Sequence, residues 1–201
     1  MRQIAEALLR IKAVTLSPTE PYTWSSGLRS PIYCDNRLTL SYPDIRNMII
    51  DGLVDAVGTT EVDVIAGTAT AGIPHGALLA DRLGLPFIYV RSSAKGHGKG
   101  NQIEGKLDDG ARVLVIEDLL STGMSSIDAA HAIREAGGEV IGIQAIFSYG
   151  LPILEKNLAD ANISATSLTI FPELVEVAES TGNLTKSEIH SLREWQQDPR
   201  A

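Results

Sequence analysis

The 201-residue chain has a single cysteine, Cys34, and no apolar run long enough to cross a bilayer. One cysteine excludes an internal disulfide and is compatible with a reducing compartment. The first ten residues mix charged and apolar side chains, so they lack the uninterrupted apolar core of a secretory signal peptide. These absences predict a cytoplasmic protein with no membrane partner.

Positive charge is also scarce, since 17 lysines and arginines are outnumbered by 25 aspartates and glutamates, which gives a formal net charge of -8. This balance argues against broad nucleic-acid binding, which depends on neutralising phosphates. Hydrophobic content of 44% and charged content of 21% are ordinary for a globular protein. At this length we expect one domain with room for a substantial core.

From residue 59 onward, apolar segments of strand length alternate with helical patterns. Strands are expected at 62–66, 85–90, 113–116, 140–147 and 164–170, and helices at 73–83, 124–136 and 152–160. This alternation predicts an α/β fold with a central, mostly parallel sheet flanked by helices. Ligands of such sheets bind at the carboxyl ends of the strands.

We expect the single domain to have three parts: a hood with the first helices at 1–58, an α/β core at 59–170 and C-terminal helices at 171–201. Within the hood, residues 14–40 are rich in proline and predicted to be irregular. The last helix carries a capping-box pattern from Thr185 to Glu188.

Residues 113–126 read V-L-V-I-E-D-L-L-S-T-G-M-S-S. Four aliphatic residues predict a strand buried on both faces, and Glu117 and Asp118, here called the acidic pair, follow at its carboxyl end. Residues 121–123, the hydroxyl turn, then lead into a helix whose N–H groups favour a phosphate. Adjacent carboxylates repel each other unless hydroxyls or cationic charge compensate them. The pattern predicts a site for a phosphorylated sugar; a polar strand end before a capped helix is the alternative.

Residues 67–72, G-T-A-T-A-G, form a second candidate motif, the glycine turn. Small side chains allow a ligand to approach the backbone closely, and the following helix start suits phosphate or pyrophosphate. Many glycine-rich turns between a strand and a helix serve packing alone. The prediction of a phosphate site here therefore depends on the neighbouring motif at residues 113–126.

Residues 91–106, R-S-S-A-K-G-H-G-K-G-N-Q-I-E-G-K, concentrate cationic side chains in an otherwise acidic chain. Loops of this length inside a compact domain are usually functional or disordered. Its glycines permit movement and its cations can neutralise a polyphosphate. An exposed solvated loop is the alternative reading of this cationic loop.

Together these motifs resemble the type I phosphoribosyltransferase family, whose phosphoribosyl-pyrophosphate signature is similar to residues 113–126. Within the family, the segment Y-T-W-S-S-G-L-R-S-P-I-Y-C-D-N-R resembles the orotate-side segment of the orotate-using enzymes, and R-S-S-A-K-G-H-G resembles their mobile catalytic loop. The resemblance covers about residues 1–180 in motif order. It implies transfer of a phosphoribosyl group to orotate in pyrimidine synthesis, giving orotidine 5′-phosphate and pyrophosphate.

The resemblance also implies a role for each matching residue. Lys95, His97, Glu117 and Asp118 would be catalytic. Phosphoribosyl pyrophosphate would contact Arg91, Lys95, His97, Glu117, Asp118, Leu119, Leu120, Ser121, Thr122, Gly123, Met124 and Ser125. Its pyrophosphate would lie on Thr68, Ala69, Thr70, Ala71 and Gly72, and orotate would contact Ser26, Gly27, Arg29 and Ser121. The family implies Mg²⁺ held mainly through substrate, with no protein ligand assigned, and a homodimer whose 91–106 loop reaches the neighbouring site.

The chain departs from several relatives on the orotate side. Those relatives carry lysine at the positions of Ser25, Ala71 and Ser92, and arginine near Tyr149. Two interpretations follow: backbone N–H groups and Arg29 share the work of binding the orotate carboxylate, or the accepted base is a different one, such as a purine or uracil. A regulator that binds phosphoribosyl pyrophosphate without turnover is a third possibility, although it would usually carry an added nucleic-acid-binding domain or basic face.

Overall fold

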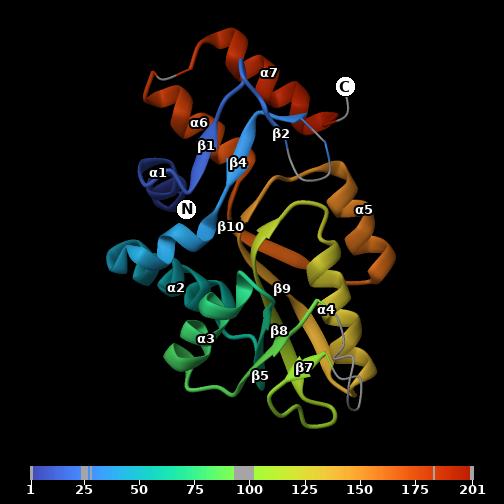
Figure 1. Ribbon diagram of the computed structural model, residues 1–201. Helices are drawn as coiled ribbons and strands as arrows, with labels where there is room; N and C mark the ends of the chain where they lie inside the picture. Colours follow the sequence, from blue (N-terminus) through green and yellow to red (C-terminus); the bar gives the residue numbers. More distant parts are fainter. Residues whose placement is uncertain (1, 24–26, 28, 93–101, 183, 200–201) are drawn as a thin grey trace.

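The computed structural model describes residues 2–23, 27, 29–92, 102–182 and 184–199. Its main sheet has the strand order β10-β9-β8-β5-β6-β7 (Figure 1). The strands are β5 (Val64–Thr68), β6 (Phe87–Val90), β7 (Ile103–Glu104), β8 (Arg112–Leu120), β9 (Glu139–Ser148) and β10 (Ala165–Ile170). Neighbouring strands are parallel except for β6 and β7, so the predicted α/β class is confirmed.

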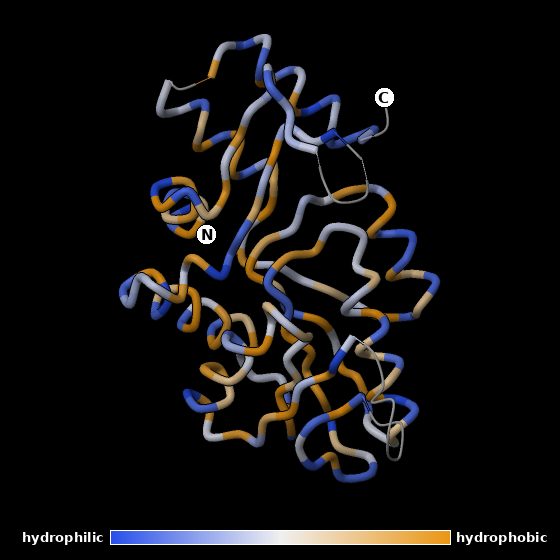
Figure 2. Tube along the Cα trace, in the orientation of Figure 1, coloured by the Kyte–Doolittle hydropathy of each residue, from blue (hydrophilic) through white to orange (hydrophobic). Residues whose placement is uncertain are grey.

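Both faces of this sheet are buried, because successive residues of β8 point to opposite sides. Val113 and Val115 belong to one hydrophobic cluster, which α4 (Met124–Glu135) and α5 (Pro152–Ala161) cover. Leu114 and Ile116 belong to the other, which contains residues of α1 (Arg2–Arg10), α2 (Pro43–Val57), α3 (Gly72–Leu83), α6 (Phe171–Ser180) and α7 (Lys186–Gln197). Figure 2 shows the hydrophobic residues concentrated along the central strands and the inner sides of these helices.

The amino-terminal segment is more ordered than predicted. Residues 14–40 were expected to be irregular, yet β1 (Val14–Leu16) pairs with β4 (Ile32–Cys34), and β2 (Tyr22–Thr23) pairs with β3 (Arg29–Ser30). A 3₁₀ helix, η1 (Asn36–Ser41), follows. Strands of two or three residues give no periodic pattern, and interspersed prolines hide the pairing from sequence reasoning.

Two segment boundaries also differ from the predictions. The strand expected at 113–116 continues to Leu120, because its backbone pairs with β9 as far as Leu120 opposite Ser148. The acidic pair therefore lies within β8 rather than after it. The cationic loop contains a short strand, β7, which pairs antiparallel with β6; residues 93–101 of this loop lie outside the described part of the chain.

The helix bounds agree closely with the sequence patterns, including the confirmed capping box between Thr185 and Glu188. Residues of the hood, the core and the C-terminal helices share one hydrophobic cluster. The division at residues 58 and 170 stays a prediction. Within the described residues, no helix is both long and apolar enough to span a membrane.

Candidate functional site

The structure brings the glycine turn and the acidic pair together at the carboxyl ends of β5 and β8. A methyl group on Gly72 would collide with the carbonyl oxygen of Ile116 and lie 3.4 Å from the Cα of Glu117. Only glycine permits this approach of the start of α3 to β8. Two motifs that are 45 residues apart in sequence thus form adjacent walls of one site.

Glu117 is a buried carboxyl group with a complete set of donors. Its side chain is 5% exposed. The N–H of Asp118 donates to Oε1 at 3.0 Å, while the hydroxyls of Ser125 and Ser126 donate to Oε2 at 3.1 Å and 2.8 Å. Ser126 was not among the predicted site residues. Its contact with Glu117 depends on how α4 packs against β8, so no sequence signal identifies it.

Burial raises the pKa of Glu117 to about 8, and the neighbouring charge of Asp118 adds to this effect. The hydrogen bond from Ser126 acts in the opposite direction. Removing a carboxylate from water disfavours its charged form, and a second carboxylate beside it does the same. Both effects favour the protonated form of Glu117 while no ligand is bound.

Asp118 is partly exposed and lies at the mouth of the same site. Its backbone carbonyl accepts a hydrogen bond of 2.8 Å from the side-chain amide of Asn36, at the start of η1. The acidic pair thus divides into a buried member, Glu117, and a more accessible one, Asp118. The hood contacts Asp118 through the hydrogen bond from the Asn36 side chain to the backbone carbonyl of Asp118.

The hydroxyl turn is fixed from two sides. The N–H of Tyr149 donates to the carbonyl of Leu120 at 3.0 Å, and the amide of Asn157 donates to the carbonyl of Thr122 at 2.8 Å. Gly123 has a φ of 78°, a left-handed conformation that favours glycine. Because Gly123 is the N-cap of α4 and has no side chain, it leaves the first-turn N–H groups open to an anion.

The glycine turn begins two residues later than predicted, at Ala69, since Thr68 is the last residue of β5. Thr68 is 4% exposed, and its hydroxyl has no hydrogen-bond partner among the described residues. The N–H of Ala69 donates to the carbonyl of Val90 at 2.9 Å, and the Ala69–Thr70 peptide is cis. Thr70 itself is exposed, and Gly72 begins α3. The turn combines a buried free hydroxyl with a helix start.

The base of the cationic loop is closed by backbone pairing. The N–H of Arg91 donates to the carbonyl of Gln102 at 2.9 Å, and the Gln102 side chain donates back to the Arg91 carbonyl at 3.2 Å. The Arg91 guanidinium lies 3.6 Å from the carboxylate of Glu104. Lys95 and His97 lie outside the described residues, so their predicted roles stay predictions.

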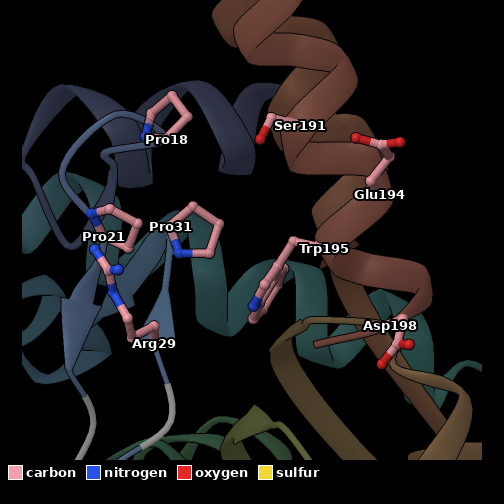
Figure 3. Close-up of a pocket in the computed structure, with 8 residues that line it drawn as sticks. All are labelled: Pro18, Pro21, Arg29, Pro31, Ser191, Glu194, Trp195 and Asp198. Carbon is pink, nitrogen blue, oxygen red and sulfur yellow. The ribbon is translucent and has the colours of Figure 1, made fainter. Parts of the chain in front are cut away.

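The predicted orotate residues are less completely placed. Arg29 lines a cavity of about 450 Å³ between the hood and α7 (Figure 3), together with Pro18, Pro21, Pro31, Ser191, Glu194, Trp195 and Asp198. Figure 3 shows its guanidinium beside Pro21. The acidic pair and the two turns do not line this cavity. Gly27 is exposed, and Ser26 lies outside the described residues. The orotate assignments of all three stay predictions.

The environments of Tyr149 and Cys34 favour the neutral forms of both side chains. Burial raises the pKa of Tyr149, with added effects from Cys34, Asp118 and Tyr33. Burial also raises the pKa of the Cys34 thiol, followed by the charges of Asp118 and Asp35. A neutral thiol is a poor nucleophile, so this environment does not activate Cys34. Among the described residues, no group of three or more His, Cys, Asp or Glu side chains could hold a metal ion.

The raised pKa of Glu117 predicts a pH-dependent stability. A carboxyl whose pKa is higher in the folded state binds its proton more tightly there, so its contribution is present at low pH and is lost as the pH rises through about 8. Glu117→Gln removes this dependence. Relative to Glu117→Gln, the wild type should lose roughly 2–4 kcal/mol of unfolding free energy between about pH 5 and pH 9. Urea denaturation of both proteins across this pH range measures the unfolding free energies. If the unfolding free energies of the two proteins changed in parallel with pH, the raised pKa of Glu117 would be contradicted.

Comparison with known proteins agrees with this geometry. Residues 41–166 match the family model described as the phosphoribosyl transferase domain. Orotate phosphoribosyltransferase of Listeria innocua is 54% identical over 200 residues, covering 98% of this chain and 96% of that protein. The same enzyme of Staphylococcus saprophyticus is 53% identical over 196 residues, covering 96% and 97%. The crystal structure of orotate phosphoribosyltransferase from Aeropyrum pernix matches with a TM-score of 0.78 at 29% identity, covering 90% of this chain and 99% of that one. The chain belongs to the phosphoribosyltransferase family, and within it to the orotate phosphoribosyltransferases.

Proposed function

We propose that this protein transfers the 5-phosphoribosyl group of phosphoribosyl pyrophosphate to orotate, a step of pyrimidine synthesis. Pyrophosphate leaves with the electron pair of the C1–O bond. A ring nitrogen of orotate forms the new C1–N bond and loses its proton to solvent or to the departing pyrophosphate, which gives orotidine 5′-phosphate. The observation that carries this proposal is the acidic pair, packed between two turns that each lead into a helix start. The named activity of relatives at 53–54% identity supports it.

The 5′-phosphate would lie at the hydroxyl turn. The open N–H groups at the start of α4, including that of Ser125, and the hydroxyls of Ser121 and Thr122 would donate hydrogen bonds to the phosphate oxygens. The Ser125 hydroxyl already donates to Glu117. Leu119 and Leu120 contribute the backbone that leads into the turn, and Met124 begins the helix. The fixed carbonyls of Leu120 and Thr122 keep this turn in one conformation, so little ordering is needed when substrate binds.

The ribose hydroxyls would donate to Glu117 and Asp118. Hydrogen bonds to the charged form of a carboxyl favour that form, so ribose binding lowers the pKa of Glu117 from its raised value. Departure of pyrophosphate leaves positive charge at ribose C1 and the ring oxygen. Ionised carboxylates in a site screened from water stabilise that developing charge strongly. The mechanism therefore has Glu117 protonated in the free protein and ionised in the substrate complex.

The leaving pyrophosphate would lie on the glycine turn. The unpartnered hydroxyl of Thr68, the backbone of residues 69–71 and the close approach at Gly72 support this placement. Arg91, Lys95 and His97 of the cationic loop would stabilise the departing charge, with Arg91 exchanging its contact to Glu104 for the substrate. Lys95 and His97 enter this account from the sequence resemblance alone.

Mg²⁺ is proposed as the cofactor, held mainly through the substrate. The donor chemistry of the site fits this ion, because Mg²⁺ prefers oxygen ligands and commonly binds one or two carboxylates together with substrate phosphates. The partly exposed carboxylate of Asp118 is the accessible protein oxygen beside the proposed ribose position. When bound, the ion supplies charge neutralisation for the pyrophosphate.

On the acceptor side, Ser26, Gly27, Arg29 and Ser121 are proposed to contact orotate. Ser121 adjoins the acidic pair through the end of β8, which supports its double assignment. Arg29 lines the cavity beside α7, which the acidic pair does not line, so its participation requires its side chain to turn toward the acidic pair. Backbone N–H groups then complete recognition of the orotate carboxylate.

A panel of acceptor bases tests the proposed reaction. The wild-type protein is incubated with phosphoribosyl pyrophosphate and Mg²⁺ plus orotate, uracil, adenine or hypoxanthine, and pyrophosphate release is followed. We expect release with orotate only. Pyrophosphate release with another base instead of orotate would identify that base as the substrate. Binding of phosphoribosyl pyrophosphate without pyrophosphate release for any base would favour a regulator that binds this compound without turnover.

We also propose a homodimer in which the cationic loop contributes to the neighbouring site, and a cytoplasmic location. The exposed hydrophobic side chains of Tyr33, Leu38 and Tyr42 on the hood offer apolar surface for subunit contact. A reduced lone cysteine is compatible with the cytoplasm.

Hybrid dimers test the shared site. Lys95→Ala and Asp118→Asn should each be inactive, because one lacks the loop cation and the other a ribose carboxylate. A loop that acts across the interface should restore activity when the two variants are mixed, up to about a quarter of the wild-type rate if exchange is random, since half of the dimers are hybrid and each has one intact site. Mass spectrometry verifies exchange. Verified hybrids without activity would indicate sites contained within one chain.

A further inference from the structure

A buried hydrogen-bonded bridge joins α3 to the acidic pair through η1. Its side chains are Asn36, Thr39 and His75, and each is 0% exposed. Asn36 and Thr39 belong to the hood, whereas His75 lies in the first turn of the helix that follows the glycine turn. Sequence reasoning gave none of the three a place in the site.

The contacts run without interruption. His75 Nε2 lies 3.1 Å from the hydroxyl oxygen of Thr39. The Thr39 hydroxyl donates to the carbonyl of Asn36 at 2.6 Å. The side-chain amide of Asn36 donates to the carbonyl of Asp118 at 2.8 Å. Three bonds therefore connect the start of α3 with the backbone of the acidic pair.

The ring of His75 makes one contact through each nitrogen. Nε2 faces the Thr39 hydroxyl, which itself has a short contact to the Asn36 carbonyl, and Nδ1 faces the carbonyl of Ala71 at 3.3 Å. A neutral imidazole has one ring hydrogen, so it donates either from Nε2 to Thr39 or from Nδ1 to Ala71. Burial lowers the pKa of His75, which favours this neutral form.

This bridge constrains the site at a second point. At Gly72, the start of α3 meets β8 by direct backbone approach to Ile116. α3 also packs against β5, β8 and α2, and the bridge from His75 to Asp118 adds a buried polar link at the first turn of this helix. Leaving a buried polar group without its partner costs the desolvation of that group, so the arrangement resists displacement.

We propose that Asn36, Thr39 and His75 are positioning residues that hold the glycine turn at a fixed place relative to Asp118. This inference rests on the proposed function, in which those two elements hold the leaving pyrophosphate and the ribose. The reaction requires the leaving pyrophosphate and the ribose to be held in a fixed relative orientation. A misplacement of about 1 Å can lower the rate about a hundredfold. None of the three side chains needs to touch substrate.

Thr39→Val tests the bridge with little change of volume. We expect kcat to fall roughly 10- to 100-fold while KM for phosphoribosyl pyrophosphate changes less than about threefold, because binding groups remain and their alignment is lost. Thr39→Ser keeps the hydroxyl and should recover most of the wild-type kcat. Thr169→Val is the matched control, since Thr169 is 1% exposed and donates to Glu173 at 2.8 Å on β10 and α6. It should lower the melting temperature without lowering kcat.

Wild-type kcat in Thr39→Val, with only a lower melting temperature, would overturn the positioning role. A second measurement is independent of turnover: in protein with ¹⁵N-labelled histidine, Thr39→Val should change the ¹⁵N chemical shift of His75 Nε2, whereas Thr39→Ser should leave it near the wild-type value. The same Nε2 shift in the wild type and in Thr39→Val would refute the bridge itself. A wild-type protein that turns over no base would refute the proposed function instead, and the shift comparison would still decide whether the bridge exists.

Discussion

The constraint on which the site depends is the repulsion between two adjacent carboxyl groups, one of them buried at the end of a central strand. Glu117 is 5% exposed and keeps its proton because burial and Asp118 both disfavour its charge. Ser125 and Ser126 donate to it but do not offset that cost fully. A ligand that donates hydrogen bonds and develops positive charge supplies the missing compensation, which is what a ribose undergoing phosphoribosyl transfer provides.

The surrounding structure can be understood from this constraint. The sheet buries β8 on both faces, which carries Glu117 into a low-dielectric position, and Gly72 lets the glycine turn approach within backbone contact of it. Gly123 turns the chain into α4, whose start bears the serines that bind Glu117. The hood contributes Asn36 and Thr39, which form the buried bridge to His75 of α3 and to the backbone of Asp118.

Much of this followed from the sequence, because the strand-helix alternation and the motif at 113–126 are local patterns. The apolar run ended at Ile116, so the strand was predicted to stop there, whereas pairing with β9 carries it through Glu117 to Leu120. The short hood strands were missed for the same reason, since their pairing is non-local. Ser126 and His75 owe their places to tertiary contacts with β8 and η1, which no spacing rule encodes. The cavity beside Arg29 likewise depends on how α7 meets the hood.

The central claim is that substrate binding ionises Glu117. Proton release on binding of Mg²⁺–phosphoribosyl pyrophosphate, measured by calorimetry at pH 7 in buffers of different ionisation enthalpy, tests it directly. A side chain whose pKa is raised to about 8 is mostly protonated at that pH, so the wild type should release up to about one more proton per site than Glu117→Gln. Comparison with this variant cancels protons that come from the substrate itself. Equal proton release by the two proteins would contradict the claim.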